Sequence, residues 1–309
     1  MDKSFIVATT LHVRRRAFAL FLTLSILAVI IALTGVLVGY LDTARKDASS
    51  TKALIQANLY FANIKKTFSR LKKREILYNT LYLGPIPLQS EDGRFSLLFS
   101  CHPMDNGINI NWLGMESKSL MQKQYNAAQQ VLEVLALEYE LSNPERLEEM
   151  IDESVHPKET FSYQTQSRME QKNGIVSYQQ FEAILNRYQF ETDDPNVGKV
   201  PWKKYFVFHP TSKAPEENRI AGDYLSAKLL SILFNIDSAI LSEDWVKTEG
   251  AFRILLGRYG ITYDKILFAD TFIDRSFCKV SYTYQKENYV FSFVDIQGEV
   301  KDFVFYGKQ

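Results

Sequence analysis

The stretch AFALFLTLSILAVIIALTGVLVGYL, from Ala17 to Leu41, decides the architecture of this 309-residue chain. It is uncharged, and the cluster Arg14–Arg16 comes directly before it. A bilayer core is about 30 Å thick and a helix rises 1.5 Å per residue, so about 20 apolar residues are enough to span it. The stretch is also longer than the apolar region of about 7–15 residues in a cleaved secretory signal. The sequence therefore predicts a membrane protein with one span and a large soluble head.

The basic residues beside this stretch predict its orientation. The tight cluster Arg14–Arg16 stands on the N-terminal side, and Arg45, Lys46 and Lys52 follow on the other side. Orientation depends on Lys and Arg close to the span, whereas acidic residues contribute little. The arginine cluster favours a cytoplasmic N-terminus and an exported head, and the opposite orientation is the alternative.

The helical pattern continues beyond the apolar stretch. No Pro or Gly occurs between Asp42 and Asn79, and apolar residues recur there at three- and four-residue steps. We therefore expect one helix from about residue 18 to the high seventies, with a membrane-spanning half (18–41) and an amphipathic half (42–80). Gly84 and Pro85 should end it. The stripe residues singled out for helix packing are Leu54, Phe61, Ile64 and Phe68.

The remainder predicts an α+β head. Two β-rich segments, 81–116 and 251–309, flank a predicted inserted helical domain, 117–250. The first segment should contain a hairpin of strands 94–101 and 107–113, and the second should end in an antiparallel meander. Helices should begin at Asn143 and Ser226, where a polar cap precedes an apolar periodic run, and another helix should begin at Ser177.

The two cysteines, Cys101 and Cys278, lie far apart in the sequence. In an oxidising compartment they could form a disulfide that closes a long loop. Two buried thiols are an equally good interpretation. Neither cysteine belongs to a C-x-x-C motif, so redox catalysis and a zinc site have no support.

Composition and motifs favour no catalytic or cofactor chemistry. Lys and Arg balance Asp and Glu at 36 each, so nothing indicates a nucleic-acid partner. The four histidines are dispersed, and the sequence has no hydrolase, metalloprotease or nucleotide-binding motif. Asp193 and Asp194 are candidate calcium ligands, but they lack the spacing of an EF-hand loop. A solvated turn is the preferred interpretation, and we expect no other cofactor.

Taken together, these features resemble a type IV pilin-like protein, specifically the K-type minor pseudopilin (general secretion pathway protein K) of type II secretion. The family has a basic leader, a small residue before the cleavage site and an aromatic first mature residue, which here would be Arg14–Arg16, Ala17 and Phe18. Ala17 departs from the usual glycine. Leu22 replaces the usual glutamate at the fifth mature position, as in K-type subunits. Short segments that resemble the family pattern are 107–111, 173–185 and 224–230.

The resemblance implies a function and a location. Residues 1–17 would be a cytoplasmic leader that a prepilin peptidase removes. The chain would cross the bacterial inner membrane once, with its span in contact with membrane lipid and its head in the periplasm. It would be a non-enzymatic tip subunit that helps to initiate and cap the pseudopilus. Its partners would be other minor pseudopilins, contacted through the stripe Leu54, Phe61, Ile64 and Phe68, and the secretion machinery. The same features also fit a subunit of a related type IV pilus system.

Two other classes of function compete with this interpretation. The chain could be a single-span membrane protein with an exported sensory or interaction domain, in which case its N-terminus would stay uncut. It could also be a membrane-anchored enzyme, which the absent motifs disfavour. The N-terminal residue of the mature protein best separates the first two classes.

Overall fold

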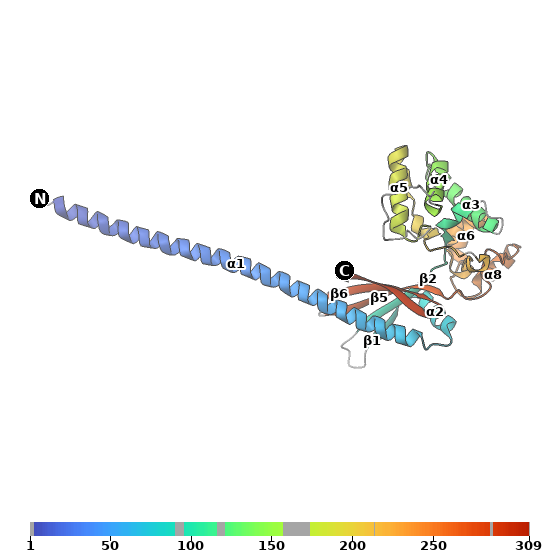
Figure 1. The fold of residues 1–309 in the computed structure, drawn as a ribbon, viewed down its shortest axis with the longest axis horizontal. Helices are drawn as coiled ribbons and strands as arrows, with labels where there is room; N and C mark the ends of the chain where they lie inside the picture. The colour runs from blue at the N-terminus through green and yellow to red at the C-terminus, as the bar shows by residue number, and fades with distance from the viewer. Residues whose placement is uncertain are drawn as a thin grey trace, which may run out of the picture.

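The structure is a computed structural model that describes residues 3–89, 96–115, 121–156, 174–212, 214–284 and 287–308, with side chains described from residue 20 onward. Its longest element is α1, Lys3–Phe68, a helix of 66 residues. At 1.5 Å per residue this helix is roughly 100 Å long. It projects from a head that contains both the sheet and the remaining helices (Figure 1).

The apolar half of α1 meets the requirements for a membrane span. An 18-residue window within Leu20–Phe68 reaches a mean hydropathy of 2.7, and none of that window is buried inside the molecule. Within the described residues, α1 is the one helix that is long and apolar enough to cross a membrane by length and composition. The predicted span therefore coincides with an exposed helix.

The predicted continuation of this helix into the high seventies is wrong. The helix α1 ends at Phe68, and α2, Arg74–Leu83, follows after a short turn. The chain turns because α2 packs onto the sheet, where Tyr78 and Leu81 are buried. Tertiary packing of this kind overrides local helix propensity. The end of α2 before Gly84 agrees with the predicted stop.

The sheet is antiparallel, with the strand order β1-β2-β5-β6-β7. The predicted C-terminal meander is confirmed by β5, β6 and β7, each of which pairs with the next. The strand bounds are β1 Ile86–Gln89, β2 Ser96–Pro103, β5 Arg275–Tyr284, β6 Glu287–Ile296 and β7 Glu299–Lys308.

The predicted hairpin of strands 94–101 and 107–113 is wrong. The strand β2 pairs with β1 and β5, whereas the short β3, Ile108–Asn109, pairs in parallel with β4, Phe206–Val207. Residues after β3 form the 3₁₀ helix η1, Ile110–Met115, all of it buried. These apolar side chains pack among the helices, and that non-local burial outweighs the local hairpin signal.

The helices beyond the sheet form a separate body, referred to below as the helical body. All three predicted helix starts are confirmed, and the side chains of Asn143, Ser177 and Ser226 each accept a hydrogen bond from a backbone N–H of the first turn. The helices are α3 Gln122–Glu138, α4 Pro144–Val155, α5 Tyr178–Thr192, α6 Ala227–Phe234, α7 Ser238–Asp244 and α8 Ala251–Arg258. Short 3₁₀ helices are η3 Pro195–Lys199, η4 Trp202–Lys204, η5 Pro215–Glu217 and η6 Gly222–Tyr224.

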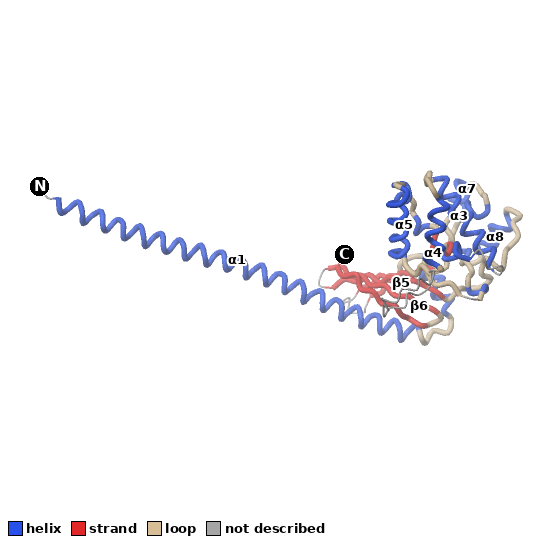
Figure 2. The backbone as a smooth tube through the Cα atoms, turned by 45° about the horizontal axis from the view of Figure 1, so that its top comes forward, coloured by secondary structure: helices blue, strands red, loops and turns tan. Residues whose placement is uncertain are grey.

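Two hydrophobic clusters divide the head. One lies between α1, α2 and the sheet, and the other holds the helical body together. Buried residues from 108–115 and 252–268 belong to the second cluster, so these segments pack with the helices although the sequence assigned them to the β-rich part. The helical body lies at the end of the molecule away from the N-terminus (Figures 1 and 2).

Candidate functional site

The exposed half of α1 is the first part of the candidate site. Its large apolar side chains between Leu20 and Leu41 are exposed, from 48% at Leu41 to 73% at Val36. Leu22 is 50% exposed. Ala17 and Phe18 lie in the helix, but their side chains are outside the described residues. Exposure of so much apolar surface to water is unfavourable, which indicates that lipid or another protein covers it.

The second half of α1 packs closely against the sheet. Ala53 and Ala57 are fully buried, and their small side chains let the helix backbone approach the strands. The hydroxyl of Tyr282 donates a hydrogen bond to the carbonyl of Ala53 at 2.5 Å. Burial raises the pKa of Tyr282, so its hydroxyl keeps the proton that this contact needs. The ring of Tyr60 meets the Tyr282 ring edge to face at 5.4 Å.

The aromatic residues of the stripe face the same sheet. The Phe61 ring lies 5.0 Å from the Phe303 ring and 5.9 Å from the Phe293 ring. Phe68 is 5% exposed and also contacts Phe293, and Ile64 is partly buried in the same cluster. Phe68 is buried against the chain's own sheet, which corrects the expectation that it contacts partner subunits, whereas such contacts of the partly buried Phe61 and Ile64 stay a prediction. The stripe binds the chain's own sheet, because the sheet offers the nearest apolar face.

A different face of α1 remains exposed. Ile55 and Leu59 are 57% and 55% exposed, one turn apart, and Leu54, at the edge between this face and the stripe on the sheet, is 38% exposed. We refer to these three residues as the outer stripe. Of the predicted packing residues in this half of the helix, Leu54 alone belongs to it. The sequence reasoning did not single out Ile55, because a helix with apolar residues on two sides does not show which side its own head covers.

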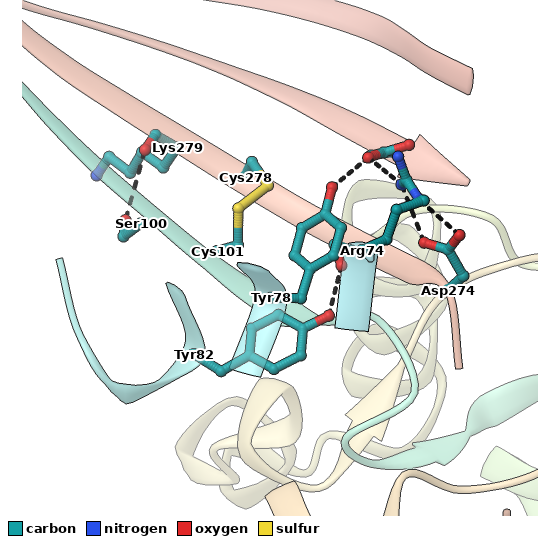
Figure 3. Close-up of a disulfide and its surroundings, with 10 residues drawn as sticks. Arg74, Tyr78, Tyr82, Ser100, Cys101, Asp274, Cys278 and Lys279 are labelled. Atoms are coloured by element: carbon teal, nitrogen blue, oxygen red, sulfur yellow. Dashed lines mark hydrogen bonds and ion pairs between the residues drawn. A yellow bond between two sulfur atoms is a disulfide. The ribbon is translucent and has the colours of Figure 1, made fainter. Parts of the chain in front are cut away.

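A buried ion pair fixes α2 to the ends of the strands (Figure 3). Arg74 Nε lies 2.7 Å from Asp274 Oδ2, and Arg74 Nη2 lies 2.5 Å from Asp295 Oδ2. The Asp295 side chain is fully buried, and it also accepts hydrogen bonds from the Tyr78 hydroxyl and the backbone N–H of Gly298. Arg74 itself is mostly buried. This cluster sets the direction in which the chain leaves the turn after α1.

The charges in this cluster are held in place by its geometry. Burial opposes a charge on Arg74, but the hydrogen bonds that it donates to Asp274 and Asp295 outweigh burial and raise its pKa above the usual value. Burial and the neighbouring Asp295 also raise the pKa of Tyr78, which therefore stays a donor. The sequence reasoning missed this cluster, since Arg74 is 200 residues from Asp274 and 221 from Asp295.

The two cysteines lie directly opposite each other in β2 and β5, and a disulfide joins them (Figure 3). The Cα atoms of Cys101 and Cys278 are 4.1 Å apart, inside the limit of about 7 Å beyond which two cysteines cannot be bridged. Both side chains are buried in the cluster under α1. The disulfide therefore connects the strand before the helical body to the first strand after it.

We expect removal of this disulfide to destabilise the head. The bridge closes a loop of 177 residues, and loss of a native disulfide typically costs about 2–5 kcal/mol. Chemical denaturation of the Cys101→Ser, Cys278→Ser variant should show a correspondingly lower midpoint, and reduction of the unmodified protein should give the same shift. The reductant should not change the variant further. Equal midpoints for the oxidised protein and the variant would contradict the expected role.

The two candidate calcium ligands have different surroundings. Asp193 ends α5 in a left-handed conformation, whereas Asp194 is 4% exposed. Asp194 accepts hydrogen bonds from the backbone N–H groups of Ser142 and Asn196 at 2.8 and 2.9 Å. Burial alone would raise the pKa of Asp194, but these donors lower it. Its oxygens thus join two loops.

No wider metal-binding arrangement surrounds this pair. In the described part of the chain, no group of three or more His, Cys, Asp or Glu side chains is placed to hold a metal ion. Calcium binding at Asp193 and Asp194 stays a prediction.

Comparisons with known proteins concern the fold. No protein-family profile matches the sequence, and no curated protein matches it. The structure is similar to a chain in the crystal structure of the GspK-GspI-GspJ complex from the enterotoxigenic Escherichia coli type 2 secretion system. The TM-score is 0.49 and the sequence identity 14%, and the alignment covers 84% of this chain and 97% of that chain. The predicted fold class, α+β with a long N-terminal helix, an antiparallel sheet and a helical block, is what the structure has.

Proposed function

We propose that this chain is a non-enzymatic minor pseudopilin of the K-type, a tip subunit that helps to initiate and cap the pseudopilus of a type II secretion system. The observation that carries the proposal is the continuity of α1. One helix passes without a break from its exposed apolar half into the half that packs on the sheet. A rigid connection of this kind lets a head be drawn out of the membrane together with its anchor.

Two further features support a position at the tip. In ordinary pilin-like subunits a glutamate at the position of Leu22 pairs with the N-terminus of a neighbour, so a subunit with nothing above it does not need this carboxylate. The helical body lies at the end of the head away from the membrane half of α1 (Figure 1). Its bulk at that end would prevent another subunit from adding on top.

The proposed location is the bacterial inner membrane, with the N-terminus in the cytoplasm and the head in the periplasm. The basic cluster before the span favours this orientation. A disulfide between Cys101 and Cys278 is the chemistry expected of an oxidising compartment. Lipid would cover the exposed half of α1 before assembly, and other minor pseudopilins would replace it afterwards, with the outer stripe extending that contact.

Processing of the N-terminus tests the proposal. We expect a prepilin peptidase to cleave after Ala17, so that Phe18 becomes the first residue. Intact-mass measurement of the protein purified from its native membrane gives the answer directly. An Ala17→Arg variant should remain uncut, because the peptidase needs a small residue before the bond. A native protein that retains Met1 would contradict the proposal and support the single-span sensory or interaction protein instead.

A further inference from the structure

A cavity of about 190 Å³ lies where α2 meets the helical body. One wall comes from one face of α2, through Glu75, Asn79 and Tyr82. The other walls come from η6, from the start of α8 and from residues 269–273. The cavity thus lies at the junction of the two bodies, apart from the disulfide and the exposed half of α1.

The interior of the cavity is aromatic. The rings of Tyr82 and Tyr224 meet edge to face with their centroids 4.8 Å apart. Phe252 is 2% exposed, and its ring packs so closely on Gly222 that a Cβ at this glycine would lie 2.4 Å from it. Tyr263 and Phe272 complete the aromatic lining. Close packing and ring-to-ring contact hold these walls in place without a ligand.

One side of the cavity already holds a cation. The guanidinium of Arg253 lies 4.7 Å from the centroid of the Tyr263 ring and 2.6 Å from a carboxylate oxygen of Asp270. A guanidinium between a ring face and a carboxylate is a favourable arrangement, because both the ring quadrupole and the anion attract it. The Arg253 contact therefore shows that a guanidinium fits between a ring and a carboxylate in this cavity.

The other side of the cavity also combines aromatic rings with carboxylates, but no cation of the described residues lies between them. Rings come from Tyr82 and Tyr224, and carboxylates from Glu75, Asp223 and Glu249. Within the described residues none of these three carboxylates forms an ion pair. Asp223 accepts from the backbone N–H groups of Gly250 and Phe252, and Glu249 accepts from the amide of Asn79 at 2.6 Å. Three carboxylates thus line this cavity.

The negative charge reaches the cavity wall. Burial, together with the carboxylates of Asp223, Glu249 and Glu75, raises the pKa of Tyr224 to about 12. The same field that disfavours a phenolate on this ring attracts a cation placed against it.

We propose that this half of the cavity binds an organic cation, a guanidinium or a primary ammonium group, which stacks against Tyr82 and Tyr224 and faces Glu75 and Glu249. The guanidinium is the better fit because it is planar and weakly hydrated, as the Arg253 contact illustrates. Its source is either an arginine or lysine side chain of a partner protein or a small free cation, and the two share this chemistry.

Calorimetric titration of the full chain in a non-ionic detergent tests the proposal. The probe is N-acetyl-arginine amide, and N-acetyl-citrulline amide is its neutral analogue of similar shape. We expect saturable binding of the arginine probe, weaker at higher salt, and none of the citrulline probe. A pentapeptide with a central arginine that binds more tightly than the amide indicates a protein partner, and equal binding indicates a small cation.

Variants locate the site. The substitutions Glu75→Gln and Glu249→Gln together should weaken binding of the arginine probe at least tenfold. The matched control, Glu182→Gln with Glu243→Gln, removes the same charge from exposed positions elsewhere on the helical body and should leave binding unchanged. Tyr224→Phe keeps the ring and should retain binding. Thermal unfolding midpoints confirm that the variants are folded. Equal binding by both charge variants, equal binding of citrulline, or no saturable binding of arginine would overturn the proposal.

Discussion

Replacing Phe68 with aspartate is expected to unfold the sheet half of the head. The Phe68 ring contacts Tyr78, Phe99 and Phe293 at the place where α1 ends, and it is 5% exposed. Loss of a buried phenylalanine alone costs about 3–5 kcal/mol. The carboxylate adds the cost of a buried charge without a partner. Because a domain is stable by only about 5–15 kcal/mol, circular dichroism should show a greatly lowered midpoint or no cooperative transition.

Leu59→Asp is the matched control for this experiment. It places the same charge on the same helix, but at an outer-stripe position that is 55% exposed. We expect this variant to keep the thermal midpoint of the unmodified protein and, under the proposed function, to co-purify less with partner pseudopilins. A Phe68→Asp variant with an unchanged midpoint would show that α1 does not hold the sheet as described. Normal co-purification of Leu59→Asp would remove the outer stripe from the assembly surface.

Replacing Arg74 with alanine is expected to cost about 3–5 kcal/mol of stability, the usual loss when one partner of a buried ion pair is removed. Asp295 would remain fully buried with its charge uncompensated. Urea denaturation gives the change in unfolding free energy. Arg74→Lys should lose less stability than Arg74→Ala, because lysine keeps the positive charge. It should still be less stable than the unmodified protein, because lysine cannot form both fork contacts to Asp274 and Asp295.

A second substitution separates the ion pair from general damage to α2. In the Arg74→Ala background, Asp295→Asn removes the uncompensated charge and should restore part of the lost stability. The two losses should therefore be far from additive, as is usual for side chains in one network. Additive losses would show that Arg74 and Asp295 do not interact in the way the structure indicates.

The sequence predicted the features that depend on local pattern. An uncharged stretch of 25 residues after Arg16 has one favourable state, a helix in an apolar environment, so the span was evident without tertiary information. The helix starts at Asn143, Ser177 and Ser226 were equally predictable, because a capping side chain bonds with its own first turn. The C-terminal meander belongs to this group too, since its strands pair with their neighbours in sequence.

The features that only the tertiary structure decided depend on partners far away in the chain. The turn after Phe68 follows from the contacts of Arg74 with Asp274 and Asp295. The residues next to the turn contain no pattern that predicts it. The choice between the stripe that binds the sheet and the outer stripe was likewise open, since a periodic pattern shows that a helix has apolar faces but not what covers each of them. The opposition of Cys101 and Cys278, and the cavity beside Tyr224, result from strand order and from the packing of two bodies. Such long-range contacts form only when the whole chain folds, because the energy that fixes them is the burial of surfaces from both partners at once.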